Sequence, residues 1–360
     1  MATTALLNYV VDPYLAFGSP RINRFNAVKT EINDYVRTAK AFEPFRYETD
    51  VLLAGNSRIE MGLDPDHACF TKLGLHAYNL GIPGAGVGQQ LNYVLNVLYV
   101  QPVKRVFLSV DFVDFLVSEG AAPPPKDSVV TTGNLPRRFD GSDNPDYAWT
   151  IAKTRFQALL SLNALTSSVQ TVFLQGAAYR PDRLANGLNP AKDFVYVTSL
   201  EGPGALFELK MASLRERLAS PLSLHYSDNT LAGDFDLFAR FLDIAAVQGV
   251  EVIVLTNPFH EWFWDLLRMQ GLFDAHADWL EEIESRVRSA PGRVTLWDFS
   301  ADSEFIRESV PLPGVKAPPL EWFWEPSHYR KSLGDKMLDS MLAKDCGSQA
   351  SFGRQFLIQN

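Results

Sequence analysis

Three residues of types that together perform acyl transfer stand far apart in the sequence. Ser57 lies in "VLLAGNSRIEMG" (51–62), where four apolar residues run into a small polar turn. Glu325 and His328 lie in "EPSH", separated by two residues. A serine nucleophile needs a base to take its proton and a carboxylate to hold the imidazole. The set would therefore attack an ester if the fold brought the three side chains together.

Each of these residues also has a structural interpretation. Serine is a favoured N-cap residue, so Ser57 could simply begin a helix. A single histidine near a helix start is more often a satisfied polar residue than a catalyst. The turn in "YNLGIPGAGVGQQL" (78–91) joins a strand end to a helix and offers backbone N–H groups to an anion. Its glycines do not follow G-x-G-x-x-G, and the lysine of a P-loop is missing, so an oxyanion fits this turn better than a nucleotide.

The elements that must position these residues alternate along the chain. Short apolar runs closed by turn residues predict buried strands, and apolar stripes at helical spacing predict helices between them. The predicted strands are 50–55, 75–81, 103–112, 249–258 and 292–300, and the predicted helices are 86–101, 234–249 and 274–289. This alternation predicts a three-layer α/β/α sandwich with a five-stranded parallel sheet of flavodoxin-like type. Ligands of such sheets bind at the carboxyl ends of the strands, and Ser57 follows one of them.

One domain is expected over residues 50–345, followed by a C-terminal tail at 346–360. The stretches 118–147 and 176–206 have many turn residues and little apolar periodicity, and both fall between the third and fourth strands. We expect two surface insertions that cap the site, with disordered filler as the alternative. The N-terminal segment 1–49 opens on an apolar run that is too short to span a membrane. One hypothesis is that it follows a removed membrane anchor.

Composition narrows the class of protein. The 360 residues are 46% hydrophobic and 21% charged, as in an ordinary globular protein. The net charge of −9 argues against general nucleic-acid binding, which depends on clustered Lys and Arg. Cys69 and Cys346 show no metal-ligand spacing and do not establish a redox compartment. No metal or organic cofactor is expected.

Taken in order, these motifs resemble those of the SGNH (GDSL-like) hydrolase superfamily, over about residues 50 to 340. "GNSR" stands where that family has Gly-Asp-Ser, with Asn56 in place of the Asp. "NLGIPG" places Gly84 at the position of the family's oxyanion glycine, and "EPSH" places Glu325 at the position of its Asp. The resemblance implies Ser57 as nucleophile, His328 as base, Glu325 as its orienting carboxylate, and an oxyanion hole formed by the N–H groups of Ser57 and Gly84.

The third motif of the family is different here. Its members usually carry an Asn after the third strand that completes the oxyanion hole, whereas this strand ends in "LSVDFVDF" with Asp111. An ionised carboxylate cannot donate a hydrogen bond, and losing one such donor typically costs about 10²–10³ in rate. Arg58 or Asn79 is a candidate replacement donor.

Within that superfamily the chain is most similar to proteins that acylate bacterial cell-surface polymers, such as alginate and cellulose O-acetylation accessory proteins and the D-alanyl-lipoteichoic acid protein. "GNSR", "SVDF" and "FWEPSHY" carry this likeness. It implies an esterase or O-acyltransferase acting on an acylated carbohydrate or envelope polymer, an extracytoplasmic location, an N-terminal anchor and a membrane-bound acyl donor protein as partner. The alternative function is a catalytically inactive partner or scaffold in an envelope complex. The alternative location is the cytoplasm, and the oligomeric state stays open.

Two further features lie near the expected ligand end of the sheet. In "TNPFHEWFW", Asn257 and His260 follow the fourth strand, so His260 either touches substrate or has a structural role. The tryptophans of the two "EWFW" segments either stack on sugar rings or pack the interior; they are Trp262, Trp264, Trp322 and Trp324.

Overall fold

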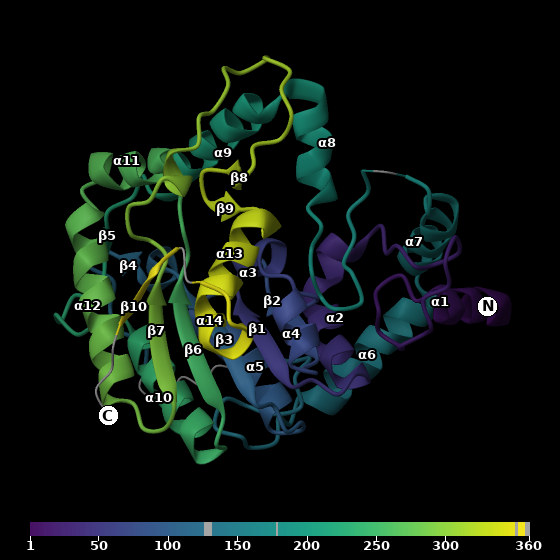
Figure 1. Cartoon of the computed structure of the whole chain (residues 1–360). Coiled ribbons are helices and arrows are strands. Elements are labelled where there is room, and N and C mark those ends of the chain that lie inside the picture. Colours follow the sequence, from purple (N-terminus) through teal and green to yellow (C-terminus); the bar gives the residue numbers. More distant parts are fainter. Residues whose placement is uncertain (126–131, 178, 350–351, 357–360) are drawn as a thin grey trace.

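The computed structural model describes residues 1–125, 132–177, 179–349 and 352–356. Its centre is a mixed sheet of six strands in the order β10-β7-β6-β3-β1-β2 (Figure 1). Five strands are parallel: β1 (Val51–Gly55), β2 (Ala77–Gly81), β3 (Arg105–Val110), β6 (Glu251–Thr256) and β7 (Val294–Asp298). They coincide with the five predicted strands. β1, β3 and β6 are almost wholly buried, as expected of apolar runs covered on both faces.

The expectation of a purely parallel, five-stranded sheet is wrong in one respect. A sixth strand, β10 (Arg354–Phe356), pairs antiparallel with β7 at the sheet edge. The segment 346–360 is therefore not only a tail. A segment of three residues is too short to show the periodicity that predicts a strand. It forms β10 only because β7 lies beside it and provides the hydrogen-bonding partners.

Helices cover both faces of the sheet. On one face α5 (Val87–Leu98) packs beside α10 (Gly233–Val247), which also contacts α12 (Phe273–Ser289). On the other face α13 (Lys331–Met341) packs on α3 (Ser57–Gly62), and α14 (Ala343–Cys346) packs on α4 (Ala68–Lys72) (Figure 1). The three predicted helices correspond to α5, α10 and α12.

Shorter elements connect these layers. Two small antiparallel pairs are β4 (Val117–Ser118) with β5 (Leu222–Ser223) and β8 (Phe323–Glu325) with β9 (His328–Tyr329). Four further α-helices are α2 (Val36–Phe42), α8 (Lys192–Glu201), α9 (Pro203–Arg217) and α11 (Glu261–Met269). Single 3₁₀ turns occur at Ile32–Tyr35, Glu43–Arg46, Phe112–Phe115 and Phe305–Arg307.

The predicted insertions are more ordered than their composition suggested. In 118–147, the described part buries Leu135 and Phe139 in the main core. In 176–206, α8 and the start of α9 are helical. Residues 126–131 and 178 lie outside the described residues.

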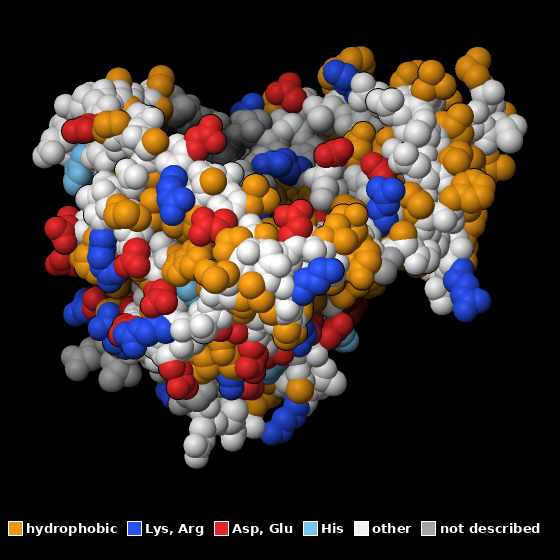
Figure 2. All heavy atoms as spheres, turned by 90° about the horizontal axis from the view of Figure 1, so that it is seen from above, with side chains coloured by type: hydrophobic (Ala, Val, Ile, Leu, Met, Phe, Trp, Pro, Cys, Tyr) orange, Lys and Arg blue, Asp and Glu red, His pale blue; other side chains and the backbone are white. Residues whose placement is uncertain are grey.

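A lobe stands beside the sheet and contains the N-terminus. It is formed by α1 (Ala2–Val11), α6 (Tyr147–Leu160) and α7 (Leu162–Phe173), which pack on one another (Figure 1). Hydrophobic side chains are dense on its surface (Figure 2, right). Among the helices of the described residues, none combines the length and the apolar character needed to cross a bilayer.

Cys69 and Cys346 form a disulfide that joins α4 to the end of α14, with 5.8 Å between their Cα atoms. The two cysteines are 277 residues apart in the sequence. No local pattern reveals such a pairing, because it exists only once α4 and α14 lie together.

Candidate active site

The strand β1 delivers Ser57 to the carboxyl end of the sheet. Gly55 ends the strand, and a Cβ on it would lie 2.7 Å from Ile59 and 2.9 Å from Ser109, so the tight exit requires glycine. The N-cap of α3 is Asn56, whose side chain accepts a hydrogen bond from the N–H of Arg58 at 3.0 Å. Ser57 is therefore the first residue of the helix and not its cap. Its hydroxyl is free to face another element.

That element is the β8–β9 hairpin, which presents His328. The Ser57 Oγ lies 2.7 Å from the His328 Nε2. On the other side of the ring, the His328 Nδ1 contacts the carboxylate of Glu325, its partner in the hairpin. With the Nδ1 proton held by Glu325, the Nε2 lone pair faces the hydroxyl of Ser57. This is the arrangement in which imidazole acts as a base toward serine.

Glu325 is completely buried and multiply hydrogen-bonded. It accepts hydrogen bonds from the backbone N–H and the hydroxyl of Ser327, both at 2.9 Å. Burial raises the pKa of Glu325, but the adjacent His328 and the Ser327 hydrogen bonds outweigh it and lower the pKa to about 2. The carboxylate is therefore ionised at neutral pH and favours a positive charge on the imidazole. Sequence reasoning passed over Ser327, although it lies inside the same "EPSH" motif.

Two backbone N–H groups are available beside Ser57. Gly84 has φ +63°, which favours glycine, and it lines the same cavity as Ser57. The carbonyl oxygen of Pro83 accepts a hydrogen bond from Arg37 at 3.2 Å, so the Gly84 N–H points the opposite way across that peptide. Within the described part of the chain, neither the Ser57 N–H nor the Gly84 N–H has a protein acceptor. A helix start leaves its first N–H groups unpaired in the same manner.

Asp111 forms the base of the site without lining the cavity. It is 2% exposed and accepts hydrogen bonds from Arg58 (2.9 Å), Asn257 (2.9 Å) and Asn56. Arg58 also donates through Nε to the carbonyl of Ser327 at 2.8 Å. Arg58 thus ties the helix that carries Ser57 both to the end of β3, through Asp111, and to the loop that carries His328, through Ser327.

The other residues predicted to lie at the site, Asn257, Asn79 and His260, have structural roles. Asn257 donates to the Ser109 hydroxyl and accepts from Tyr329. Asn79 is fully buried, and its amide donates to the carbonyls of Ile59, within α3, and of Leu63, which follows the helix. Both N–H groups of that amide are therefore used, which leaves none for an oxyanion.

His260 is also fully buried. It caps α11 through Nδ1 and contacts the Glu308 carbonyl through Nε2 at 2.8 Å. The four tryptophans of the two "EWFW" segments pack in the interior or against it, and none of them lines the cavity at Ser57.

The cavity at Ser57 has a volume of about 530 Å³ and a polar wall contributed by α9. That wall consists of Lys210, Ser213, Leu214 and Arg217, spaced at helical intervals along one face. None of the described residues of 118–147 or 176–206 lines this cavity, so the segment after the second insertion shapes it instead. Sequence reasoning missed α9 because its apolar residues are not confined to one face: Leu206, Phe207 and Met211 are buried, whereas Leu209 is exposed.

One ionisable group of the cavity has a perturbed pKa. Burial and the neighbouring Asp111 raise the pKa of Asp114 to about 6, against a lowering influence of Arg58. Its carboxylate accepts hydrogen bonds from Asn56 and Gln90, both at 3.0 Å. Asp114 therefore takes up a proton just below neutral pH.

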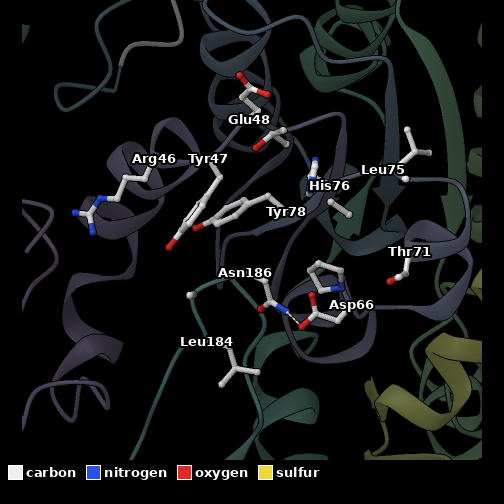
Figure 3. Close-up of a pocket in the computed structure, with 15 residues that line it drawn as sticks. Arg46, Tyr47, Glu48, Asp66, Thr71, Leu75, His76, Tyr78, Leu184 and Asn186 are labelled. Carbon is white, nitrogen blue, oxygen red and sulfur yellow. Dashed lines mark hydrogen bonds between the residues drawn. The ribbon is translucent and has the colours of Figure 1, made fainter. Parts of the chain in front are cut away.

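A larger cavity of about 810 Å³ lies at the start of β2, away from the carboxyl ends of the strands. Figure 3 shows Tyr47 and Tyr78 side by side in it, and Asn186 hydrogen-bonded to Asp66 at 2.8 Å. Ser57, Glu325 and His328 are not among its lining residues. Ser57 and this larger cavity are therefore at different places.

No protein-family model matches the chain, and no curated protein matches it. Among the described residues, no group of three or more His, Cys, Asp or Glu side chains is arranged to hold a metal ion.

Proposed function

We propose that the protein is a serine-dependent acyl-transfer enzyme of SGNH type, an esterase or O-acyltransferase that acts on an acylated carbohydrate or cell-envelope polymer. One observation carries this proposal: the Ser57 Oγ lies 2.7 Å from the His328 Nε2, while the buried Glu325 holds the opposite ring nitrogen. The two residues of this contact are 271 positions apart, so local structure alone does not explain it.

In the proposed reaction, His328 takes the proton of Ser57 as Oγ attacks the ester carbonyl carbon. The tetrahedral intermediate places its oxyanion toward the N–H groups of Ser57 and Gly84. His328 then gives the proton to the departing alcohol oxygen, which leaves the acyl group on Ser57. A water molecule or a sugar hydroxyl, deprotonated by His328, attacks this acyl-enzyme and regenerates the serine. Glu325 stabilises the imidazolium at both stages and keeps its charge.

The fold and the disulfide support the rest of the proposal. A mostly parallel sheet with Ser57 at the carboxyl end of β1 agrees with an SGNH-type domain. A disulfide between Cys69 and Cys346 favours an oxidising, extracytoplasmic location. In that setting the acyl group would come from a membrane-bound donor protein.

A second candidate, an inactive partner or scaffold, has one observation in its favour. Asp111 stands where the related enzymes carry an Asn donor, and it is committed to Arg58 and Asn257. The oxyanion hole then has backbone donors alone, and the reaction would be slower by about 10²–10³.

The test is turnover of a small acetyl ester and labelling by a fluorophosphonate probe. Ser57→Ala should abolish labelling and lower turnover by up to about 10⁶. Ser213→Ala is the matched control, because this serine lines the same cavity but is not among the hydrogen-bond partners of His328 in the described residues. Equal labelling of wild type and Ser57→Ala would reject the proposal, and a folded wild type that neither labels nor turns over ester would favour the scaffold.

A further inference from the structure

The lobe of α1, α6 and α7 exposes an unusual amount of apolar surface. Large apolar side chains on all three helices are between 37% and 82% exposed: Leu6, Tyr9, Val10, Trp149, Phe156, Leu160, Leu162, Val169 and Phe173. Figure 2 shows hydrophobic side chains spread over this part of the surface. Isolated apolar side chains on a surface are ordinary, but a contiguous set marks a contact with something other than water.

These residues follow a regular helical pattern. On α6, Trp149, Phe156 and Leu160 are spaced by seven and four residues, and on α7, Leu162, Val169 and Phe173 repeat the same spacing. This spacing places each set along one face of its helix. Such a stripe normally faces a protein core, yet here it faces outward.

The inner face of α7 is correspondingly polar. The residues that α7 buries are Ala164, Ser167, Ser168 and Thr171. The Ser168 hydroxyl donates to the side chain of Asn8 on α1 at 2.8 Å, and Asn8 donates to the Leu159 carbonyl at 2.9 Å. The Ser167 hydroxyl lies 3.1 Å from that of Tyr14. The lobe is therefore held by small residues and hydrogen bonds, with its large apolar residues outside.

The charge of the lobe is opposite to that of the whole chain. The chain has 42 acidic against 33 basic residues, but α1, α6 and α7 contain no Asp or Glu. Their only charged side chains are Lys153 and Arg155, both exposed on α6. The nearest acidic residue before α6 is its N-cap, Asp146. Lys153 lies on the same face of α6 as Trp149, whereas the guanidinium of Arg155 stacks over the ring of Phe42. An apolar face that carries a cation and no anion is complementary to a bilayer, whose negatively charged headgroups lie over a hydrocarbon interior.

We infer that this lobe docks on the surface of an anionic lipid bilayer. The outward stripes of α6 and α7, with Leu6 and Tyr9, enter the headgroup boundary, where Trp, Tyr and Phe are favoured. Lys153 contacts the lipid phosphates, and Arg155, stacked over Phe42, adds to the positive potential beside this face. A helix of 14 residues is about 21 Å long and lies in the interface without spanning it. The inference concerns a different face from Ser57 and holds whether or not the proposed reaction occurs.

The experiment is flotation of the purified full chain with lipid vesicles. Vesicles of phosphatidylcholine with about one-third phosphatidylglycerol should carry the protein upward, and pure phosphatidylcholine should carry less of it. Trp149→Ser with Phe173→Ser should weaken partitioning by roughly tenfold per aromatic side chain removed. Val247→Ser with Leu312→Ser is the matched control, since these residues are 90% and 76% exposed elsewhere. It should float like wild type.

A second pair of variants tests the charge. Lys153→Gln with Arg155→Gln should lower binding to the anionic vesicles by roughly fivefold per charge and leave binding to pure phosphatidylcholine unchanged. Thermal unfolding of each variant checks that the fold is kept, which is expected because the altered side chains are exposed. Wild type that stays at the bottom of the gradient with both vesicle types would overturn the inference. It would equally be overturned if Trp149→Ser with Phe173→Ser converted a dimer in solution to a monomer without changing flotation, since the lobe would then bind a second copy of the chain.

Discussion

Replacing Glu325 by Gln tests the part of the site that the structure describes in most detail. The change keeps the shape of the side chain but removes the charge beside His328. The amide also presents an N–H₂ group as well as an oxygen, so it can hold the imidazole in the wrong tautomer. The hydrogen bonds from Ser327 to the Gln oxygen can remain, and the fold should survive.

The size of the effect follows from the electrostatics of the pair. The pKa of Glu325 falls from its ordinary 4.5 to about 2, mainly because His328 outweighs the cost of burial. That difference corresponds to roughly 3 kcal/mol by which His328 and the Ser327 hydrogen bonds together favour the charged carboxylate over the cost of burial. Loss of up to this amount in the transition state slows the reaction by up to roughly 200-fold. The wrong tautomer adds to the loss, toward the roughly 10⁴ known for the equivalent change in a serine protease triad.

The assay is kcat/KM for p-nitrophenyl acetate at neutral pH, with the rate of fluorophosphonate labelling as a second readout. Ser327→Ala is the control, because it removes one hydrogen bond to the Glu325 carboxylate but leaves its charge in place, and it should cost roughly tenfold, less than Glu325→Gln. Both variants should unfold near the wild-type temperature. If Glu325→Gln stays within about threefold of wild type while Ser57→Ala is inactive, Glu325 does not act through His328 and the reasoning is refuted.

Three further predictions concern the cavity wall, the perturbed carboxyl and the disulfide. Lys210→Gln with Arg217→Gln should lower kcat/KM for negatively charged esters by roughly fivefold per charge removed and leave kcat/KM for neutral esters unchanged. Arg215→Gln, on the same helix but outside the cavity, should change neither value. Equal losses on both types of ester would contradict this prediction. The raised pKa of Asp114 means that, between pH 3.8 and about 6, the native state keeps a proton that the unfolded chain has released. The free energy of unfolding should therefore fall by up to about 3 kcal/mol as the pH rises through that interval. Asp114→Asn should remove this fall, as urea titrations at pH 4 and pH 7 would show; an unchanged pH dependence would count against the assignment. Reduction of the Cys69–Cys346 disulfide releases a loop that spans 277 residues and should cost up to about 5 kcal/mol. Dithiothreitol should therefore lower the melting temperature of wild type but not of Cys69→Ser with Cys346→Ser, and a wild-type melting curve that stays the same after complete reduction would show that the bridge adds no stability.

The strands and helices around the site followed from local sequence. Residues 51–55 and 251–256 are apolar runs closed by turn residues. They form β1 and β6 because a short apolar run is removed from water most readily as a strand in the centre of a sheet. The positions of Ser57 after β1 and of Glu325 three residues before His328 were also visible in the sequence. The contact between Glu325 and His328 needed only a short turn, which "EPSH" supplies.

The contacts between distant segments could be identified only from the tertiary structure. The approach of Ser57 to His328, the disulfide and the pairing of β10 with β7 join residues far apart, and no local periodicity encodes which distant partner a segment meets. The wall of α9 at the cavity and the outward stripe of α7 belong to the same class. A helix sequence shows that one face is apolar, but whether that face turns toward the core or away from it depends on the packing of its neighbours. In α7 the hydrogen bonds that Asn8 offers favour burial of the polar face, so the apolar face turns outward.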